Sequence, residues 1–371
     1  MAIYSIIFLL NSLSGFVKKN QKKYIIIFVF ILLTLLSGTR YYMGGSDVYA
    51  YEVYFNNAPD VSIVLKYIFT GINQGVDTSV EPGFILINSI IKSLGFNYFG
   101  FTLIISIIFY FFMYNGLKFY VKEWSVVIAL FMYKLMFYNT FISIRQGITI
   151  AIFFYAIRYI INKELIKYFL ICFVAFYIHR ASLFLFPIYF VRYIPISKKI
   201  LFITSIAFLP TIFIRDYVNF ENIINNIIST IGFGEKSLGW SESIESVSLI
   251  HTFEMYIIIF ICIYFYSALE DKIPERRIFL QLLLVLIPIF TLFSNWIIFT
   301  RLKDYLVICY AILFQLIITS KKIKNGDLKM YLKCIFLFVC FIGMIRYVYV
   351  FDNGALINYE SFIFQSKSIF Y

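Results

Sequence analysis

The stretch YIIIFVFILLTLLSGTRYYMGGSDVYAYEVYF, residues 24–55, decides the class of this protein. Its first half is an apolar run close to the length of a helix that crosses a ~30 Å hydrocarbon core. Its second half places an arginine, an aspartate, a glutamate and five tyrosines where that helix ends. The pattern predicts a membrane-spanning helix that brings polar and aromatic groups to one membrane surface.

Composition extends this prediction to the whole chain. Of the 371 residues, 61% are hydrophobic and 14% are charged, whereas soluble domains carry roughly 25% charged residues. Residues 1–16 are apolar and precede the first lysines, which is the reverse of a secretory signal peptide, so we expect them to be retained as a first span. The sequence therefore predicts an all-α polytopic membrane protein.

Apolar runs define about twelve candidate transmembrane helices, with a range of 10–13. We expect one integral membrane domain over residues 1–371. The candidate spans are residues 1–16, 24–39, 99–117, 124–140, 142–161, 168–180, 181–196, 200–214, 252–268, 278–298, 302–320 and 331–350.

The distribution of basic residues predicts the orientation. With both termini outside, most of the 32 Lys and Arg residues fall in inner segments, as the positive-inside rule requires. Residues 168–196 form either one long helix or two short helices that meet near the outer face. We favour two short helices, because a single crossing would invert the charge bias of everything that follows.

Two long outer segments, residues 40–98 and 215–251, are rich in Gly, Asn, Ser and acidic residues, which is typical of water-facing chain. Within the first, residues 82–95 have apolar positions that share one helical face, and Pro82 opens the first turn. We expect an amphipathic helix there, at the outer membrane surface.

Arginines at the outer ends of spans are the most informative charges. A guanidinium group suits phosphate or carboxylate oxygens through paired hydrogen bonds, while simple anchoring of a helix end is the alternative. In FISIRQGITIAIFF, the polar side chains beside a glycine favour binding over anchoring. For Arg301, an ion pair with Asp304 is the competing interpretation. The candidates for binding an anionic ligand are Arg40, Arg145, Gln146, Arg180 and Arg301.

Carboxylates and a histidine supply candidates for proton transfer. Asp47 follows two glycines in a turn with little packing reason for an acid, so it is the first candidate for a general base, and Glu81 is the second. Glu81 also suits the positive end of a helix dipole. His179 is a further catalytic candidate. Tyr49 and Glu52 are candidates for sugar binding, although most tyrosines here also fit an interfacial aromatic belt.

Other classes of function find little support in the sequence. The five cysteines lie in apolar runs without CxxC spacing, and only two histidines are present, so we expect no metal site and no cofactor. No Gly-rich phosphate loop precedes a helix. The net charge of +12 is scattered between apolar segments, which favours membrane orientation over nucleic-acid binding.

Four segments resemble the EpsG family of extracellular polysaccharide polymerases, which is related in role to the Wzy polymerases. The first is similar to the RYxxGxDxxxY opening of that family, the others follow in the family's order, and a weaker fifth segment, RLKDYLVICY, lies near the C-terminus. The resemblance covers about residues 1–350. The four segments are RYYMGGSDVYAYEVYF, EPGFILINSIIKSLGFNY, FISIRQGITIAIFFYAIRY and HRASLFLFPIYF.

The resemblance implies a glycosyltransferase, similar to polytopic GT-C-like enzymes, that joins polyprenyl-diphosphate-linked oligosaccharide repeats into an exopolysaccharide, capsule or O-antigen chain. It implies a bacterial cytoplasmic (inner) membrane location with the active site facing outward. Membrane lipid, a chain-length regulator and a flippase of the same pathway are the implied partners. A lipid-linked oligosaccharide flippase or transporter, or a polysaccharide ligase, is the alternative function.

Overall fold

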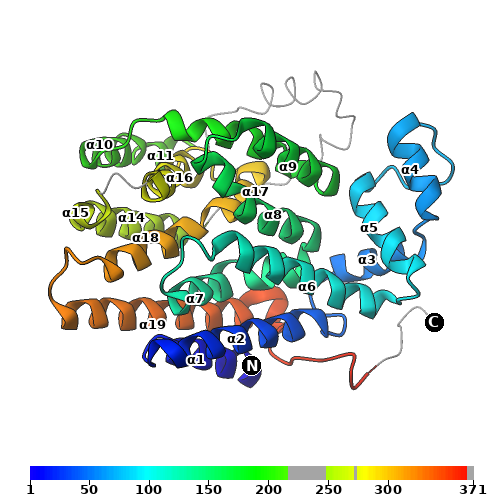
Figure 1. Cartoon of the computed structure of the whole chain (residues 1–371), viewed down its shortest axis with the longest axis horizontal. Helices are drawn as coiled ribbons and strands as arrows, with labels where there is room; N and C mark the ends of the chain where they lie inside the picture. The colour runs from blue at the N-terminus through cyan, green and yellow to red at the C-terminus, as the bar shows by residue number, and fades with distance from the viewer. Residues whose placement is uncertain (216–247, 271–273, 366–371) are drawn as a thin grey trace. The chain divides into compact units, whose positions relative to one another are not determined.

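A computed structural model describes residues 1–215, 248–270 and 274–365 (Figure 1). These residues are helical, and the extended backbone among them pairs only at an isolated antiparallel bridge between Arg40 and Ser361. The chain divides into two compact units. One comprises Met1–Phe186 with Asp327–Tyr371, and the other comprises Pro187–Gly326.

The first unit is built on long apolar helices. Helix α6 packs against α2 and α8, α8 packs against α9, and α1 packs against α2 and α7 (Figure 1). A short π-helix, η1, joins α7 to α8. The elements are α1 (Ala2–Ser14), α2 (Lys19–Gly38), α6 (Tyr98–Leu117), α7 (Trp124–Lys134), η1 (Phe137–Ile142), α8 (Ile144–Ile161), α9 (Leu165–Ile178) and α19 (Gly326–Val350), followed by η4 (Phe351–Gly354).

Three helices lie in the first predicted outer segment, near the start of α6 (Figure 1). They are α3 (Asp47–Asn56), α4 (Val61–Thr70) and α5 (Pro82–Ser93). Helix α5 confirms the helix predicted at residues 82–95. It buries Phe84 against Tyr51 of α3 and Phe101 of α6. This apolar cluster fixes the outer segment on the ends of the long helices.

The second unit contains α10 (Lys198–Phe208), α11 (Thr211–Ile214), α14 (Leu249–Tyr264), α15 (Tyr266–Leu269), α16 (Pro274–Phe290), α17 (Ile297–Leu306) and α18 (Ile308–Thr319). The run predicted at 278–298 ends earlier, at Phe290. Pro288 has no N–H to donate within the last turn, which weakens helix continuation there. Most of the predicted outer segment 215–251 lies outside the described residues.

Among the described residues, five helices are long and apolar enough to cross a membrane. They are Asn20–Gly38, Tyr98–Leu117, Ile144–Ile161, Phe299–Thr319 and Gly326–Gly354. Further apolar helices of 10–17 residues accompany them. The protein is thus an α-helical polytopic membrane protein, and these lengths do not support a count of twelve crossings.

The helix is interrupted at His179, where two short helices were predicted to meet. Helix α9 ends at Ile178, and His179 has extended backbone torsions (φ −153°, ψ 116°). The next element is a 3₁₀ helix, η2 (Arg180–Tyr193), so the second half is wound more tightly than an α-helix. At the break, the backbone N–H of Arg180 pairs outside the helix, with the Glu81 side chain.

A glycine brings α8 close to the π-helix. A Cβ atom at Gly147 would overlap the carbonyl oxygen of Asn139, so only glycine allows the first turn of α8 to lie against η1. The polar sequence Arg145–Gln146–Gly147 therefore opens a helix whose start is fixed by a backbone contact.

Candidate functional site

The Glu81 carboxylate joins three segments that are distant in the sequence. Its Oε2 accepts a hydrogen bond from Arg145 Nη1 at 2.5 Å. Its Oε1 accepts the backbone N–H of Arg180 at 3.0 Å and lies 3.3 Å from His179 Nδ1. Four residues predicted as functional from the sequence thus meet at one carboxylate, and we call them the Glu81 cluster.

Local sequence explains why Glu81 reaches this position. It is the N-cap residue of α5, its backbone is extended, and Pro82 occupies the first turn. A Cβ atom at Gly83 would lie 2.7 Å from the carbonyl oxygen of Tyr177, so the glycine lets the start of α5 rest against the end of α9. The carboxylate therefore points to the break that follows α9.

Arg145 lies between the carboxylate and an aromatic wall. Its guanidinium carbon is 5.8 Å from the centre of the Tyr51 ring and 5.9 Å from that of Phe84, distances typical of cation–π contact. It also hydrogen-bonds the Tyr51 hydroxyl. Its Nε has no hydrogen-bond partner within the described parts of the chain. The side chain is 24% exposed, so Arg145 is anchored yet reachable by an anionic ligand.

The electrostatics of the cluster keep Glu81 ionised. Burial alone would raise the pKa of its carboxyl group. The close contact with His179, the charge of Arg145 and the backbone N–H of Arg180 outweigh burial, and the pKa of Glu81 falls well below its usual range. A carboxylate with so low a pKa is a poor general base at neutral pH, which favours a positioning role for Glu81.

We expect Glu81→Gln to destabilise the first unit by about 3 kcal/mol, because it leaves the buried Arg145 without its counter-charge. The folded-state pKa of Glu81 lies below the unfolded value of about 4.3, so this contribution is present above that pH and is lost as pH falls below it. Unfolding midpoints of the purified protein at pH 7 and pH 4 measure it.

Glu164→Gln is the matched control for this prediction, since Glu164 makes an exposed pair with Lys167. Its unfolding midpoint should match that of the wild type at both values of pH. If Glu81→Gln shows no greater destabilisation than Glu164→Gln at pH 7, the ion pair with Arg145 does not stabilise the fold.

Asp47 and Tyr49 are both exposed residues of α3. Asp47 is exposed in the first turn of α3, and it is one of the charges acting on Tyr51, the tyrosine that Arg145 contacts. Tyr49 is 38% exposed, and its ring stacks on Tyr42 with centroids 5.4 Å apart. A free carboxylate and an aromatic face thus lie on the helix that packs beside the Glu81 cluster.

Glu52 occupies a different environment on the same helix. It is 2% exposed and accepts a hydrogen bond from the Tyr42 hydroxyl at 2.5 Å. This contact ties Glu52 to the tyrosine on which Tyr49 stacks. The Glu52 carboxylate is therefore enclosed, and the exposed group in this set of contacts is the Tyr49 ring.

Arg40 lies apart from the Glu81 cluster. It is 3% exposed, donates from Nη1 to the Ser37 carbonyl oxygen, and lies over the Phe141 ring. Its Nε and Nη2 have no hydrogen-bond partner in the described residues. Burial lowers the pKa of Arg40. The positions of its neighbours are fixed by the antiparallel pairing with the segment around Ser361.

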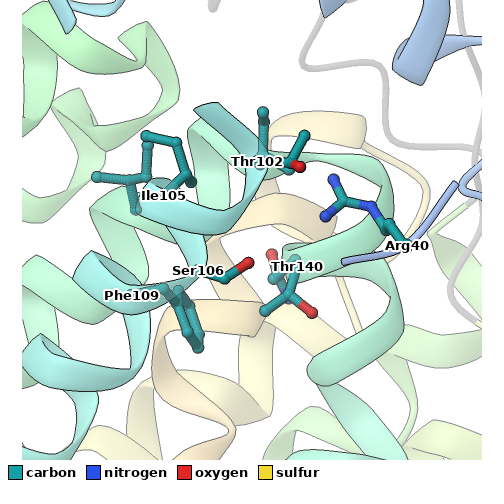
Figure 2. A pocket seen from close by; sticks show the side chains of 9 residues that line it. Arg40, Thr102, Ile105, Ser106, Phe109 and Thr140 are labelled. Carbon is teal, nitrogen blue, oxygen red and sulfur yellow. The ribbon is translucent and has the colours of Figure 1, made fainter. Parts of the chain in front are cut away.

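The Arg40 side chain lines a small polar cavity. Figure 2 shows its guanidinium group facing the same space as the side chains of Thr102, Ser106 and Thr140. The cavity measures about 10 Å³, which is room for a single water molecule. A diphosphate group does not fit this space, so Arg40 is best explained as a buried charge beside α6 and η1.

The other predicted residues differ in setting. Gln146 is fully buried at the start of α8. Arg301 belongs to α17 of the second unit. Within the described ranges, no group of three His, Cys, Asp or Glu side chains is arranged to hold a metal ion.

Sequence reasoning missed two contributors to the site, Tyr42 and Tyr51. Both lie in the tyrosine-rich stretch, where an interfacial aromatic belt explains most such residues. Tyr51 follows Asp47 by four residues, one helical turn, and that spacing was the available signal for a shared helix face.

Comparison with known proteins supplies one match. The model of the EpsG family matches residues 23–361, nearly the whole chain. No curated protein and no solved structure matches. The match covers all of the Glu81 cluster and all five segments that carry the resemblance, and it supports a polysaccharide polymerase-like role in general. The chain belongs to the EpsG family.

Proposed function

We propose that this protein is a glycosyltransferase that polymerises polyprenyl-diphosphate-linked oligosaccharide repeats. The observation that carries the proposal is the Glu81 cluster, in which Arg145 and the residues at the helix break converge on one carboxylate. Family membership supports the polymerase-like role. The cluster supplies what glycan transfer from a lipid diphosphate needs, which is oriented positive charge beside a water-facing helix.

In the reaction, the acceptor hydroxyl oxygen attacks the anomeric carbon of the donor sugar. The bond from that carbon to the diphosphate oxygen breaks, and the diphosphate leaves with the electron pair. Arg145 and Arg180 bind the departing diphosphate and stabilise its developing charge. Asp47 takes the proton of the attacking hydroxyl. Each new glycosidic bond lengthens the chain by one repeat.

Glu81 and His179 position the arginines. Glu81 holds the Arg145 guanidinium in a fixed plane, and its bond to the Arg180 backbone N–H fixes the start of η2. His179 Nδ1 lies 3.3 Å from the same carboxylate, so Glu81 also sets the orientation of the His179 ring.

Tyr49 is the proposed platform for a sugar ring. Aromatic faces pack on the apolar faces of sugars, and half-exposed Tyr49 is backed by Tyr42 through ring stacking. Glu52 holds Tyr42 in place by accepting a hydrogen bond from its hydroxyl group. The acceptor hydroxyl would then approach the N-terminal end of α3, where Asp47 lies.

The proposal includes a topology. The site faces outward from the bacterial cytoplasmic membrane, and the architecture is similar to GT-C-like enzymes. A flippase of the same pathway delivers the lipid-linked repeats, and a chain-length regulator limits the product. The product is an exopolysaccharide, a capsule or an O-antigen chain.

Cells that lack the protein test the function directly. Complementation with the wild type should restore a ladder of polymer lengths on gels, and cells without it should accumulate single lipid-linked repeats on the outer leaflet. Repeats that stay on the cytoplasmic leaflet would identify a flippase. Polymer that forms normally but stays on its lipid carrier would identify a ligase. Either pattern overturns the polymerase proposal.

A further inference from the structure

A groove in the first unit shares no lining residue with the Glu81 cluster. It occupies about 550 Å³ and is formed by the start of α2, the end of α6 and the residues that lead into α7. Sites of this size accept a small molecule or a lipid headgroup. Its lining residues are Asn20, Lys22, Lys23, Tyr24, Ile26, Ile27, Tyr114, Lys122 and Trp124.

The charge of this groove is strongly positive. Lys22 Nζ lies 2.7 Å from Glu123 Oε2, and the buried Lys333 Nζ lies 3.3 Å from the other oxygen of the same carboxylate. The single negative charge of Glu123 thus pairs with two ammonium groups. The exposed Lys23 and Lys122 add two more positive charges. An anion bound here would reduce this imbalance.

Beside the lysines, the groove has an aromatic floor and an apolar edge. The Tyr114 and Trp124 rings are stacked with centroids 5.4 Å apart, and Phe30 meets Trp124 edge-on at 5.3 Å. Tyr24 and Ile27 of α2 are 73% and 40% exposed. Exposed apolar side chains follow the lysines within one or two helical turns. This order matches a phospholipid, in which the lysines would contact the headgroup and the apolar side chains would contact an acyl chain.

We propose that this groove binds an anionic phospholipid. Lys23 and Lys122 hold the phosphodiester, and an acyl chain lies along Tyr24 and Ile27. The rigid rings of Tyr114 and Trp124 form the floor under the glycerol backbone. A free phosphate would satisfy the lysines alone, whereas a lipid also covers the exposed apolar side of α2. This site is independent of the proposed polymerase activity.

The test is lipid binding by the purified full-length protein, measured by native mass spectrometry with phosphatidylglycerol and phosphatidylcholine. We expect a clear preference for phosphatidylglycerol in the wild type. Lys23→Gln with Lys122→Gln should weaken phosphatidylglycerol binding about tenfold or more, since each surface lysine contributes about fivefold. Lys22 is left unchanged so that Glu123 keeps its partner.

Lys163→Gln with Lys167→Gln is the matched control, because it removes the same charge from two exposed lysines, one between α8 and α9 and one in the first turn of α9. This variant should bind phosphatidylglycerol as the wild type does. Equal losses in both variants, or equal binding of both lipids by the wild type, would overturn the proposal. Inorganic phosphate should fail to displace the lipid, and full displacement would instead identify a simple phosphate site.

A second measurement does not depend on variants. Phosphatidylglycerol that carries a photoreactive group on its acyl chain should crosslink to the α2 peptide containing Tyr24 and Ile27 in the wild-type protein. Crosslinking spread evenly over the apolar helices, without enrichment at α2, would contradict a lipid held in this groove.

Discussion

Replacing Arg145 by alanine is expected to lower polymerase turnover about 10²–10³-fold, the usual loss when one oriented donor to a developing negative charge is removed. Arg145 is the guanidinium that is both anchored by Glu81 and partly exposed. The measurement is conversion of purified lipid-linked repeats to polymer by the detergent-solubilised enzyme. Arg145→Lys should retain an intermediate rate, because it keeps the charge but loses the paired donors.

The control for this prediction lies on the same helix. Arg158 sits near the other end of α8, where its guanidinium packs over the Tyr155 ring. Arg158→Ala should leave turnover close to that of the wild type at equal membrane abundance. If Arg145→Ala polymerises at the wild-type rate, the Glu81 cluster is not the diphosphate site.

Replacing Asp47 by asparagine is expected to lower turnover about 10²–10⁴-fold, the range that a general base contributes. The variant keeps the size and polarity of the side chain in the exposed first turn of α3. Turnover of the wild type should fall in acid, where a general base is protonated, and this acid limb should disappear in Asp47→Asn. The measurement is the pH profile of turnover for both proteins.

Asp60→Asn is the matched control for Asp47, since it removes an exposed carboxylate that precedes α4 in the same outer segment. It should keep both the rate and the acid limb. An unchanged pH profile in Asp47→Asn would assign the proton to a different group and would leave Asp47 as a helix N-terminal charge.

The sequence predicts the helices well where a single physical signal dominates. Long apolar runs locate α2, α6 and α8, and the one-sided spacing after Pro82 locates α5. Helix α3 was missed because its apolar residues alternate with tyrosines and charges that also suit a surface loop. Helix α4 was missed because its apolar run of 10 residues is too short to cross a membrane. The run 278–298 was overextended because hydropathy alone does not register the effect of Pro288 on the helix end.

The sequence named the residues of the Glu81 cluster one by one but did not predict that they meet. Glu81, Arg145 and His179 were candidates from their local settings, yet Glu81 and Arg145 are separated by 64 positions. No periodicity reports a contact over that distance. The sequence pattern also does not report the burial of a single side chain, so the enclosed position of Arg40 could not be predicted. At Gly83 and Gly147 the backbone lies close to another segment. In the sequence these positions appear only as glycines beside polar residues.

The bond between Glu81 and Arg145 has a consequence for what the site rejects. In the resting protein, an ionised carboxylate already occupies one edge of the guanidinium. A small inorganic anion would have to compete with the Glu81 carboxylate for Arg145, and its binding free energy would be small. A lipid diphosphate brings additional contacts from its sugar and its chain, which can outweigh the competition. By occupying the guanidinium of Arg145, Glu81 would thus leave the enzyme insensitive to free phosphate. It would also ease release of the polyprenyl diphosphate after transfer.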